Sequence, residues 1–220
     1  MKLTVISDTH TRHRELELPG GDVLIHAGDF MGSGYIVDEL IDFLKWLEEQ
    51  PYKHKIFIAG NHDRMFEDDP SYTEDILRHF DESVIYLQDD SCTIDGINFY
   101  GSPWTLEFMG WAFQIHNHYE DAEHWRKIPK DTDVLITHGP AYGWLDQVER
   151  SPGQLSEHLG SKELHNWIDH NNPTLHICGH IHSAQGVLEG YGQITTHINA
   201  SCLGEDYKYS HSKNYIEWEL

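Results

Sequence analysis

The sequence is poor in basic residues, and this shortage excludes one class of partner. Its 220 residues include 15 Lys and Arg against 37 Asp and Glu, a formal net charge of -22. A surface of that sign repels polyanions and anionic lipid, so we expect neither long nucleic acid nor a membrane as a partner. The largest basic cluster, residues 12–14 (Arg-His-Arg), is too short for a nucleic-acid track.

Cysteines and long apolar runs are also scarce. Cys92, Cys178 and Cys202 form no C-x-x-C motif and are odd in number, so we expect small buried hydrophobes in a reducing compartment. The N-terminal run reaches Ser7 and Asp8 too early for a signal peptide, and no later run approaches the length of a membrane span. We therefore predict a cytoplasmic protein. The sequence does not fix the oligomeric state, and a homodimer stays open.

Apolar runs typical of strands alternate with helical patterns in the first half of the chain. The predicted strands cover residues 2–6, 22–26, 55–59, 92–94, 97–100, 133–137 and 174–178, with antiparallel strands at 186–188, 193–198 and 215–218. The predicted helices cover residues 36–49, 71–80, 119–127 and 162–169. The second of them is expected to open with the capping box Ser71-x-x-Glu74. With no linker or repeat in view, residues 1–220 are predicted to form a single α/β domain with mixed sheets.

Five of the predicted strands end in polar residues of the same few kinds. They run into Asp8-Thr9-His10, Gly28-Asp29, Gly60-Asn61-His62-Asp63, His138-Gly139 and Gly179-His180-Ile181-His182. Ligands of open α/β sheets gather beyond the carboxyl ends of the strands, so we expect these side chains in one site. Alternate residues of an extended segment point the same way, which lets Asp8 converge with His10, and His180 with His182.

The set of donor atoms indicates two metal ions. The candidate ligands offer nitrogen and oxygen but no sulfur, and they are Asp8, His10, Asp29, Asn61, His138, His180 and His182. This set is too large for a single tetrahedral zinc, and it suits two divalent ions of the Mn, Fe, Zn or Ni type that share a carboxylate. Two ions about 3.5–4 Å apart form the clamp used by phosphatases and nucleases. The sequence therefore predicts a two-metal phosphoesterase.

Taken in order, these motifs resemble those of the calcineurin-like metallophosphoesterase superfamily. The stretches DVLIHAGDF, IAGNHD, GSPWTLEFMGWAF, VLITHGP and HINAS are similar to its metallophosphoesterase-domain-containing subfamily, which is related to class III cyclic nucleotide phosphodiesterases. The resemblance implies two facing mixed β-sheets flanked by helices, in four layers. It also implies one metal held by Asp8, His10 and His182, a second held by Asn61, His138 and His180, and Asp29 bridging the two.

The same resemblance implies the reaction. His62 would be the catalytic histidine, oriented by Asp63, and a hydroxide bridging the metals would attack the phosphorus atom in line. The leading hypothesis is hydrolysis of small phosphodiesters, with cyclic nucleotides as one case. A phosphomonoesterase, a dinucleotide pyrophosphohydrolase, a nuclease for short oligonucleotides and a non-catalytic interaction scaffold of the same fold stay open.

Several other residues have both a functional and a structural interpretation. The segment 12–14 would either grip a substrate phosphate or form a solvated loop. His26, inside a predicted strand, is expected to be a hydrogen-bonded core histidine. A separate zinc site is not favoured for His116, His118 and His124. A wall for a nucleobase or aryl group, or simple packing of a long loop, would account for Trp104, Phe108, Trp111 and Phe113.

Overall fold

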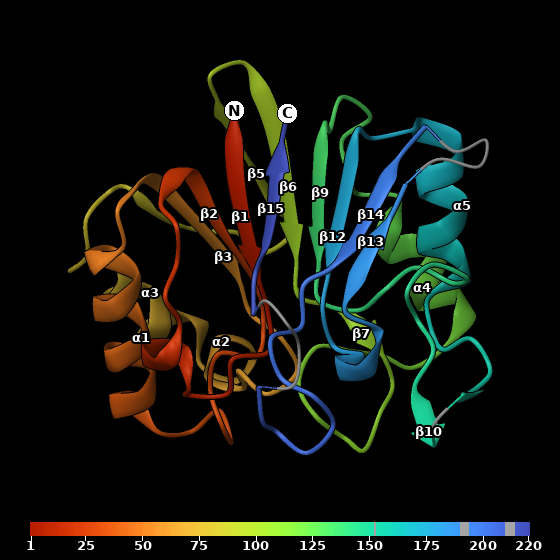
Figure 1. Cartoon of the computed structure of the whole chain (residues 1–220), viewed down its shortest axis with the longest axis horizontal. Helices are drawn as coiled ribbons and strands as arrows, with labels where there is room; N and C mark the ends of the chain where they lie inside the picture. The colour runs from red at the N-terminus through yellow and green to blue at the C-terminus, as the bar shows by residue number, and fades with distance from the viewer. Residues whose placement is uncertain (152, 190–193, 210–213) are drawn as a thin grey trace.

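The computed structural model describes residues 1–151, 153–189, 194–209 and 214–220, and in it two mixed β-sheets face each other (Figure 1). The first sheet contains, in spatial order, β15 (Ile216–Glu219), β1 (Lys2–Ile6), β2 (Gly21–Ala27), β3 (Tyr52–Ile58) and β4 (Val84–Tyr86). The second contains β13 (Gly186–Leu188), β14 (Thr196–Asn199), β12 (Leu175–Cys178), β9 (Val134–Thr137), β6 (Ile97–Ser102) and β5 (Asp90–Ile94).

Helices cover the outer face of each sheet, so the layers run helix, sheet, sheet, helix (Figure 1). The first sheet carries α1 (Val37–Glu49) and α3 (Pro70–Leu77), and the second carries α4 (His118–Trp125) and α5 (Lys162–Asn171). Shorter elements are α2 (Met65–Asp68), η1 (His13–Glu15), η2 (His182–Ala184), β7 (Thr105–Leu106), β8 (Gln114–Ile115), β10 (Glu149–Ser151) and β11 (Gln154–Leu155). The prediction of two facing mixed sheets flanked by helices is confirmed.

The inner strands are parallel, which decides where the site forms. Within the first sheet β1 to β4 pair in parallel, and within the second β6, β9, β12 and β14 do so, while β15, β13 and β5 add antiparallel edges. Parallel strands place their carboxyl ends along one edge of a sheet. The loops that follow them therefore meet at one end of the molecule, opposite the two chain termini (Figure 1).

The core explains why the inner strands are continuous apolar runs. Side chains such as Val5, Ile25 and Ile136 are buried between the two sheets, and their neighbours Leu24 and Leu135 are buried beneath the helices. A strand buried on both faces needs apolar residues at every position, and Val and Ile favour the extended backbone.

One detail at the edges differs from the sequence prediction. The capping box at Ser71 is wrong, because Asp69 is the N-cap of α3 and its Oδ1 accepts hydrogen bonds from the Tyr72 amide at 3.1 Å and the Ser71 hydroxyl at 3.0 Å. Pro70 then occupies the first helical position, where no amide donor is needed. The prediction of antiparallel C-terminal strands is confirmed, because β13 and β14 pair antiparallel and β15 pairs antiparallel with β1; β14 also pairs in parallel with β12, and Gln193 lies outside the described residues.

None of the helices in the described ranges combines the length and the apolar character that crossing a bilayer requires.

Removing an aromatic ring from beneath α1 tests the packing of the first sheet. Phe43 is fully buried and stacks on Phe30 with ring centroids 4.1 Å apart. We expect Phe43→Ala to lower the free energy of unfolding by about 3–5 kcal/mol in urea denaturation, because it leaves a cavity among aromatic side chains. The control Tyr119→Ala, at a side chain that is 81 % exposed, should change it by less than about 0.5 kcal/mol. Equal losses in the two variants would contradict this core assignment.

Candidate metal centre

Loops that follow strands of the two sheets place the candidate ligands at the junction between the sheets, which we call the seam. Hydrogen bonds continue the strand ladders into these loops: the Asp8 amide donates to the Gly28 carbonyl at 2.9 Å, and the His10 amide to the Asp29 carbonyl at 3.0 Å. In the second sheet the Gly179 amide donates to the His138 carbonyl at 3.0 Å. The loop backbones are therefore nearly as constrained as the strands that precede them.

The backbone at this seam adopts conformations that side chains other than glycine rarely take. Asp8, His10, Asp29 and His180 have φ angles of 53°, 39°, 58° and 67°, and the β-branched Thr11 has a φ of 66°. Each such residue costs of order 1–3 kcal/mol, and concentrations of them mark functional loops. Nothing in the amino-acid pattern announces this strain.

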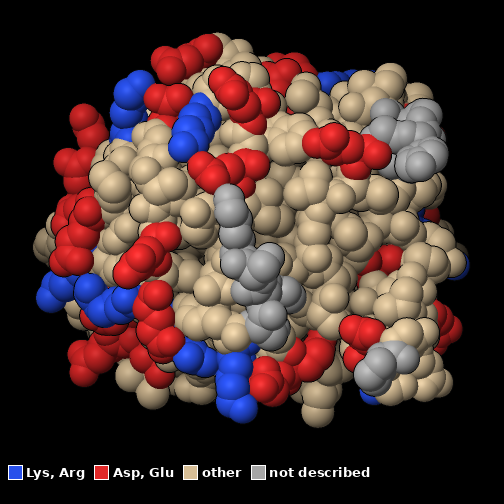
Figure 2. Space-filling model, in the orientation of Figure 1, with Lys and Arg blue, Asp and Glu red and all other residues tan. Residues whose placement is uncertain are grey.

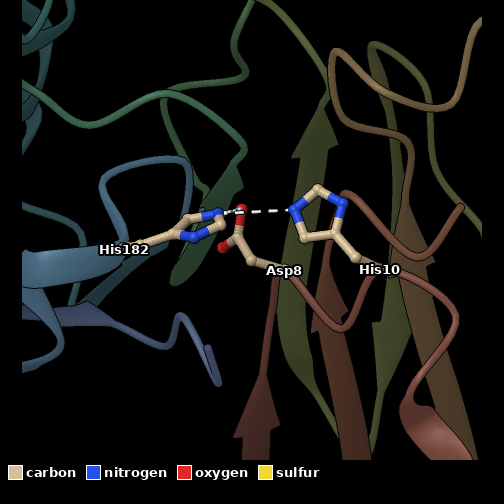
Figure 3. A group of neighbouring side chains, drawn as sticks. All are labelled: Asp8, His10 and His182. Atoms are coloured by element: carbon tan, nitrogen blue, oxygen red, sulfur yellow. Dashed lines mark hydrogen bonds and ion pairs between the residues drawn. The ribbon is translucent and has the colours of Figure 1, made fainter. Parts of the chain in front are cut away.

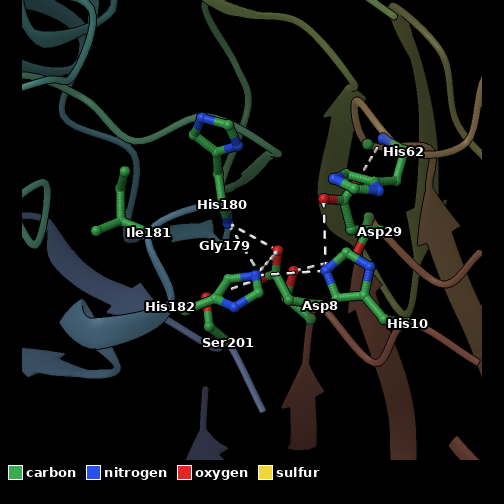
Figure 4. A network of polar contacts seen from close by, with 12 residues as sticks. Asp8, His10, Asp29, His62, Gly179, His180, Ile181, His182 and Ser201 are labelled. Carbon is green, nitrogen blue, oxygen red and sulfur yellow. Dashed lines mark hydrogen bonds and ion pairs between the residues drawn. The ribbon is translucent and has the colours of Figure 1, made fainter. Parts of the chain in front are cut away.

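Asp8 lies at the centre of the seam (Figures 3 and 4). Both of its carboxylate oxygens accept from the His180 amide at 3.1 Å, one accepts from the Ser201 hydroxyl at 2.8 Å, and one lies 3.4 Å from His182 Nε2. Although burial opposes ionisation, the hydrogen bond and charge of His182 lower the pKa of Asp8 below its usual range. Asp8 follows β1 of the first sheet, and these partners follow β12 and β14 of the second.

Asp29 makes the corresponding contacts on the other side of the seam. Its Oδ2 lies 3.3 Å from His138 Nε2 and 3.8 Å from His10 Nε2, and its Oδ1 accepts from the His62 amide at 2.8 Å. Burial again opposes ionisation, but the charge and hydrogen bond of His138 hold the pKa of Asp29 well below its usual range. Asn61 Oδ1 lies 2.9 Å from His138 Nε2, which brings the amide side chain into the same group.

Backbone carbonyls fix the tautomers of three histidines. The Nδ1 atoms of His10, His138 and His182 contact the carbonyl oxygens of Met31 at 3.2 Å, Ala27 at 2.9 Å and Gly204 at 3.1 Å. A carbonyl only accepts, so each Nδ1 carries the proton and a neutral ring presents a lone pair at Nε2. The Nε2 atoms of His10 and His182 face each other 3.3 Å apart, close enough for one cation to contact both. Histidines that bind metals characteristically donate a hydrogen bond from the N–H of their other ring nitrogen in this way, so these three histidines fit divalent cations.

Without a cation, two of these histidines retain protons. Burial lowers the pKa of His182, but the hydrogen bond and charge of Asp8 outweigh it and raise the pKa to about 9. Asp29 does the same for His138, whose pKa rises to about 9 against burial. Burial dominates at His10 and lowers its pKa to about 4. His138 and His182 would therefore release these protons at neutral pH if their Nε2 atoms bound a metal ion.

The structure brings most of the predicted ligands into overlapping groups. Ligand atoms lie within 4.8 Å of one another in three sets: Asp8, His10 and His182; Asp8, Asp29 and His138; and His10, Asp29 and His62. His180 lies outside these groups. Its amide faces Asp8, while its ring points away from Asp8 (Figure 4) and lies beside the His138 ring, with centroids 5.1 Å apart. Its ring still lines the same pocket.

His62 is held by contacts other than the predicted one. Its Nδ1 donates to the Gly32 carbonyl at 2.7 Å, and its ring stacks on Trp111 with centroids 3.9 Å apart and an interplanar angle of 24°. Asp63 instead accepts from the amides of Gly60, Asp29 and Met31 at 2.7, 2.8 and 2.9 Å. The expectation that Asp63 orients the His62 ring therefore differs from the structure, in which Asp63 ties together the loops after β2 and β3.

Three residues beside the centre were missed from the sequence. Ser201 donates to Asp8, and the Asn199 side chain donates to the Gly179 and Ile181 carbonyls at 3.3 and 3.1 Å. Tyr207 packs edge-on against His10 and His182, with centroids 4.8 and 5.3 Å away. The stretch HINAS was a signal for the first two, because it covers the carboxyl end of β14 and the two residues after it.

The remaining sequence interpretations divide between structure and site. Arg12 and Arg14 pair with Glu15 and Asp42 at 2.8 Å, so these two cations serve the fold. His26 is a buried core histidine bonded to Thr9 Oγ1 at 2.9 Å, as predicted.

The aromatic loop, residues 104–113, contributes side chains both to the packing of the fold and to the site. Phe113 is fully buried and Trp104 donates to Asp89 at 2.9 Å, whereas Phe108 lines the pocket and Trp111 supports His62.

A joint zinc site is ruled out for His116, His118 and His124, because the last is buried against Asp89 at 3.1 Å while the others are exposed and pair with Glu107 and Glu163. Cys178 and Cys202 are buried as expected, and Cys92 is half-buried.

A pocket of about 230 Å³ opens over the seam. Asp29, Asn61, His180 and His182 form its floor, and Glu107 and Glu205 are its other charged lining residues. No Lys or Arg is among the described residues that line it. On the face shown in Figure 2, acidic side chains predominate and the basic ones form small separate groups.

Comparisons with known proteins agree with the fold and identify the family. The calcineurin-like phosphoesterase family model matches residues 1–184. The human metallophosphoesterase domain-containing protein 1 is 37% identical, with 94% of this chain and 68% of that protein covered, and a UPF0046 protein of Caenorhabditis elegans is 38% identical, with 91% and 69% covered. The crystal structure of TT1561 of Thermus thermophilus superposes with a TM-score of 0.60 at 12% identity, covering 91% of this chain and 88% of that one. The chain belongs to the calcineurin-like phosphoesterase family, whose members are metal-dependent hydrolases of phosphoesters.

Proposed function

We propose that this protein hydrolyses small phosphodiesters with two divalent cations bound between its sheets. The observation that carries the proposal is the facing pair of Nε2 atoms at 3.3 Å, with buried carboxylates beside them. One cation would be held by Asp8, His10 and His182 and the other by Asn61, His138 and His180, with Asp29 between the two. Such cations lower the pKa of a bound water from 15.7 to about 7 and offset charge on the phosphoryl oxygens.

His62 supplies the proton for the leaving group in this proposal. Its Nδ1 is bonded to the Gly32 carbonyl, and the His62 side chain lines the pocket. In its cationic form the ring donates the Nε2 proton to the leaving oxygen as the P–O bond breaks. The stack on Trp111 restricts the plane of the ring, so the donor keeps its direction through the reaction.

The charge of the pocket favours diesters over the alternatives. A phosphodiester carries one negative charge, whereas a phosphomonoester or a dinucleotide pyrophosphate carries about two or more near neutral pH. The cations would offset the charge of the phosphoryl group that they contact, but Glu107 and Glu205 repel any further charge elsewhere on the substrate, and no described lining Lys or Arg compensates for it. A single-charge substrate therefore suits this pocket best.

A substrate comparison tests the proposal. The metal-loaded protein should hydrolyse bis-p-nitrophenyl phosphate with a kcat/KM at least about tenfold above that for p-nitrophenyl phosphate, a difference of about 1.4 kcal/mol in activation free energy. The measurement is release of p-nitrophenolate, with chelator-treated protein as the inactive control. A preference for the monoester would overturn the assignment to diesters.

Two substitutions separate metal binding from proton transfer. Asp29→Asn should lower both metal content and turnover, because it removes the charge shared by the two halves of the centre. His62→Ala should leave metal content intact and lower kcat by about 10²–10⁴-fold, the range expected for a lost general acid. Bound metal is measured by elemental analysis and turnover with the same diester. Normal turnover of the His62 variant would remove this residue from the mechanism.

Metal binding should release protons at neutral pH. The pKa values of about 9 at His138 and His182 mean that both rings are protonated in the metal-free protein at pH 7. Calorimetric titration of Mn²⁺ in buffers of different ionisation enthalpy should report release of about two protons per protein at pH 7. Above pH 9 the two rings have already lost these protons, so proton release on metal binding should vanish there. Below pH 9 the protons compete with the metal, so the affinity for Mn²⁺ should rise as the pH increases to about 9. Heats that do not depend on the buffer would contradict the assignment of these ligands.

A further inference from the structure

We propose that the pocket contains, beside the phosphate position, a subsite for one uncharged apolar ester group. It is formed by Leu106, Phe108, Val148, Leu159 and Ile181, which we call the apolar wall. The inference rests on the proposed hydrolysis of phosphodiesters and names the chemical class of the group that the ester carries: aryl or branched alkyl.

The apolar wall stands directly beside the candidate metal centre. Its residues share the pocket with Asp29, His180 and His182. The ring of Phe108 meets the His180 ring edge-on, with centroids 6.2 Å apart, and the Ile181 side chain points away from Asp8 in Figure 4. A substituent of a phosphate bound over the floor of the pocket therefore meets apolar side chains first.

Buried polar contacts hold the segments that carry the wall. Asp146 is 1% exposed, and its carboxylate accepts from the amides of Gly143 and Gly160 at 3.0 Å and contacts His158 Nδ1 at 2.6 Å, which fixes the chain on both sides of Leu159. The Glu149 amide donates to Ser183 Oγ at 2.9 Å and ties the segment of Val148 to that of Ile181.

Pairing within the aromatic loop fixes the remaining part of the wall. Thr105 and Leu106 in β7 pair with Gln114 and Ile115 in β8, and the Phe108 amide donates to Gln114 Oε1. A surface held in this way is formed before the ligand arrives, so a bound group gains affinity without ordering the loop.

Polarity decides which group the wall accepts. Phe108 and Leu159 are 52% and 41% exposed, so a bound apolar group removes their surface from water. An anionic group is repelled by Glu107 and Glu205. A group rich in hydrogen-bonding atoms would have those atoms left without partners against the apolar wall. Aryl and branched alkyl groups avoid both penalties.

A second cavity of about 600 Å³ lies next to the subsite and shares Leu106, Glu107 and Leu159 with the first. An ester group longer than the wall can extend into that cavity, so the selection concerns polarity next to the phosphate more than total length.

Esters with a common leaving group test this assignment. p-Nitrophenyl phosphodiesters whose second ester is methyl, phenyl, 1-naphthyl or carboxymethyl differ only in the group offered to the wall. We expect kcat/KM to rise about tenfold or more from methyl to the aryl esters, as for other apolar pockets, and to fall for carboxymethyl. Leu159→Ala and Phe108→Ala should each lower the aryl-to-methyl ratio several-fold. Met109→Ala, next in the chain but 81% exposed and outside the pocket lining, is the matched control and should keep the wild-type ratio.

Binding supplies a readout that does not require turnover. Phenyl methylphosphonate should bind the metal-loaded protein about tenfold more tightly than methyl methylphosphonate by calorimetry, and Leu159→Ala should remove most of that difference. Circular dichroism melting confirms that each variant is folded. A flat ester series, or cyclic nucleotides preferred over the aryl esters, would overturn the wall assignment while hydrolysis of the methyl ester still upheld the phosphodiesterase. Failure to hydrolyse any diester would overturn both.

Discussion

Two buried carboxylates hold this molecule together at its functional end. Asp8 and Asp29 follow strands of the first sheet and are 0% and 2% exposed, and an unpartnered charge at such buried positions is very costly. Their partners, His182, Ser201 and His138, all come from the second sheet. The contacts that assemble the candidate metal centre therefore also join the two sheets, beside the apolar core that lies between them.

The strain of the loops follows from this constraint. Ligands can converge only if the chain turns sharply after each strand, which forces left-handed backbone at residues such as Asp8 and His180. Asp63 offsets part of that cost by accepting three amides from the loops after β2 and β3. Hydrogen bonds among protein atoms therefore fix the ligand positions, which keeps the reorganisation needed for metal binding small.

The sequence predicts the features that depend on local pattern. Continuous Val and Ile runs predict strands buried on both faces, and polar residues at their ends predict the common site. The roles of Trp111 and Ser201 depend on contacts between distant segments; Ser201, for example, is 193 residues from Asp8 in the sequence. Tryptophan and serine are also not residue types that mark a metal site. The error at Ser71 was different in kind, because two competing caps lay close together and only the position of the helix decided between them.

The antiparallel pair β1–β15 has a practical consequence. Its register sets Lys2 opposite Glu219, and the Met1 amino group donates to the Leu220 carbonyl at 2.8 Å. Both ends of the chain thus lie together at the end of the molecule opposite the loops that follow the parallel strands (Figure 1). An affinity tag, a fluorescent label or an immobilising tether attached at either end is expected to leave the pocket unobstructed, and joining the two ends would allow the chain to be reopened at a surface loop.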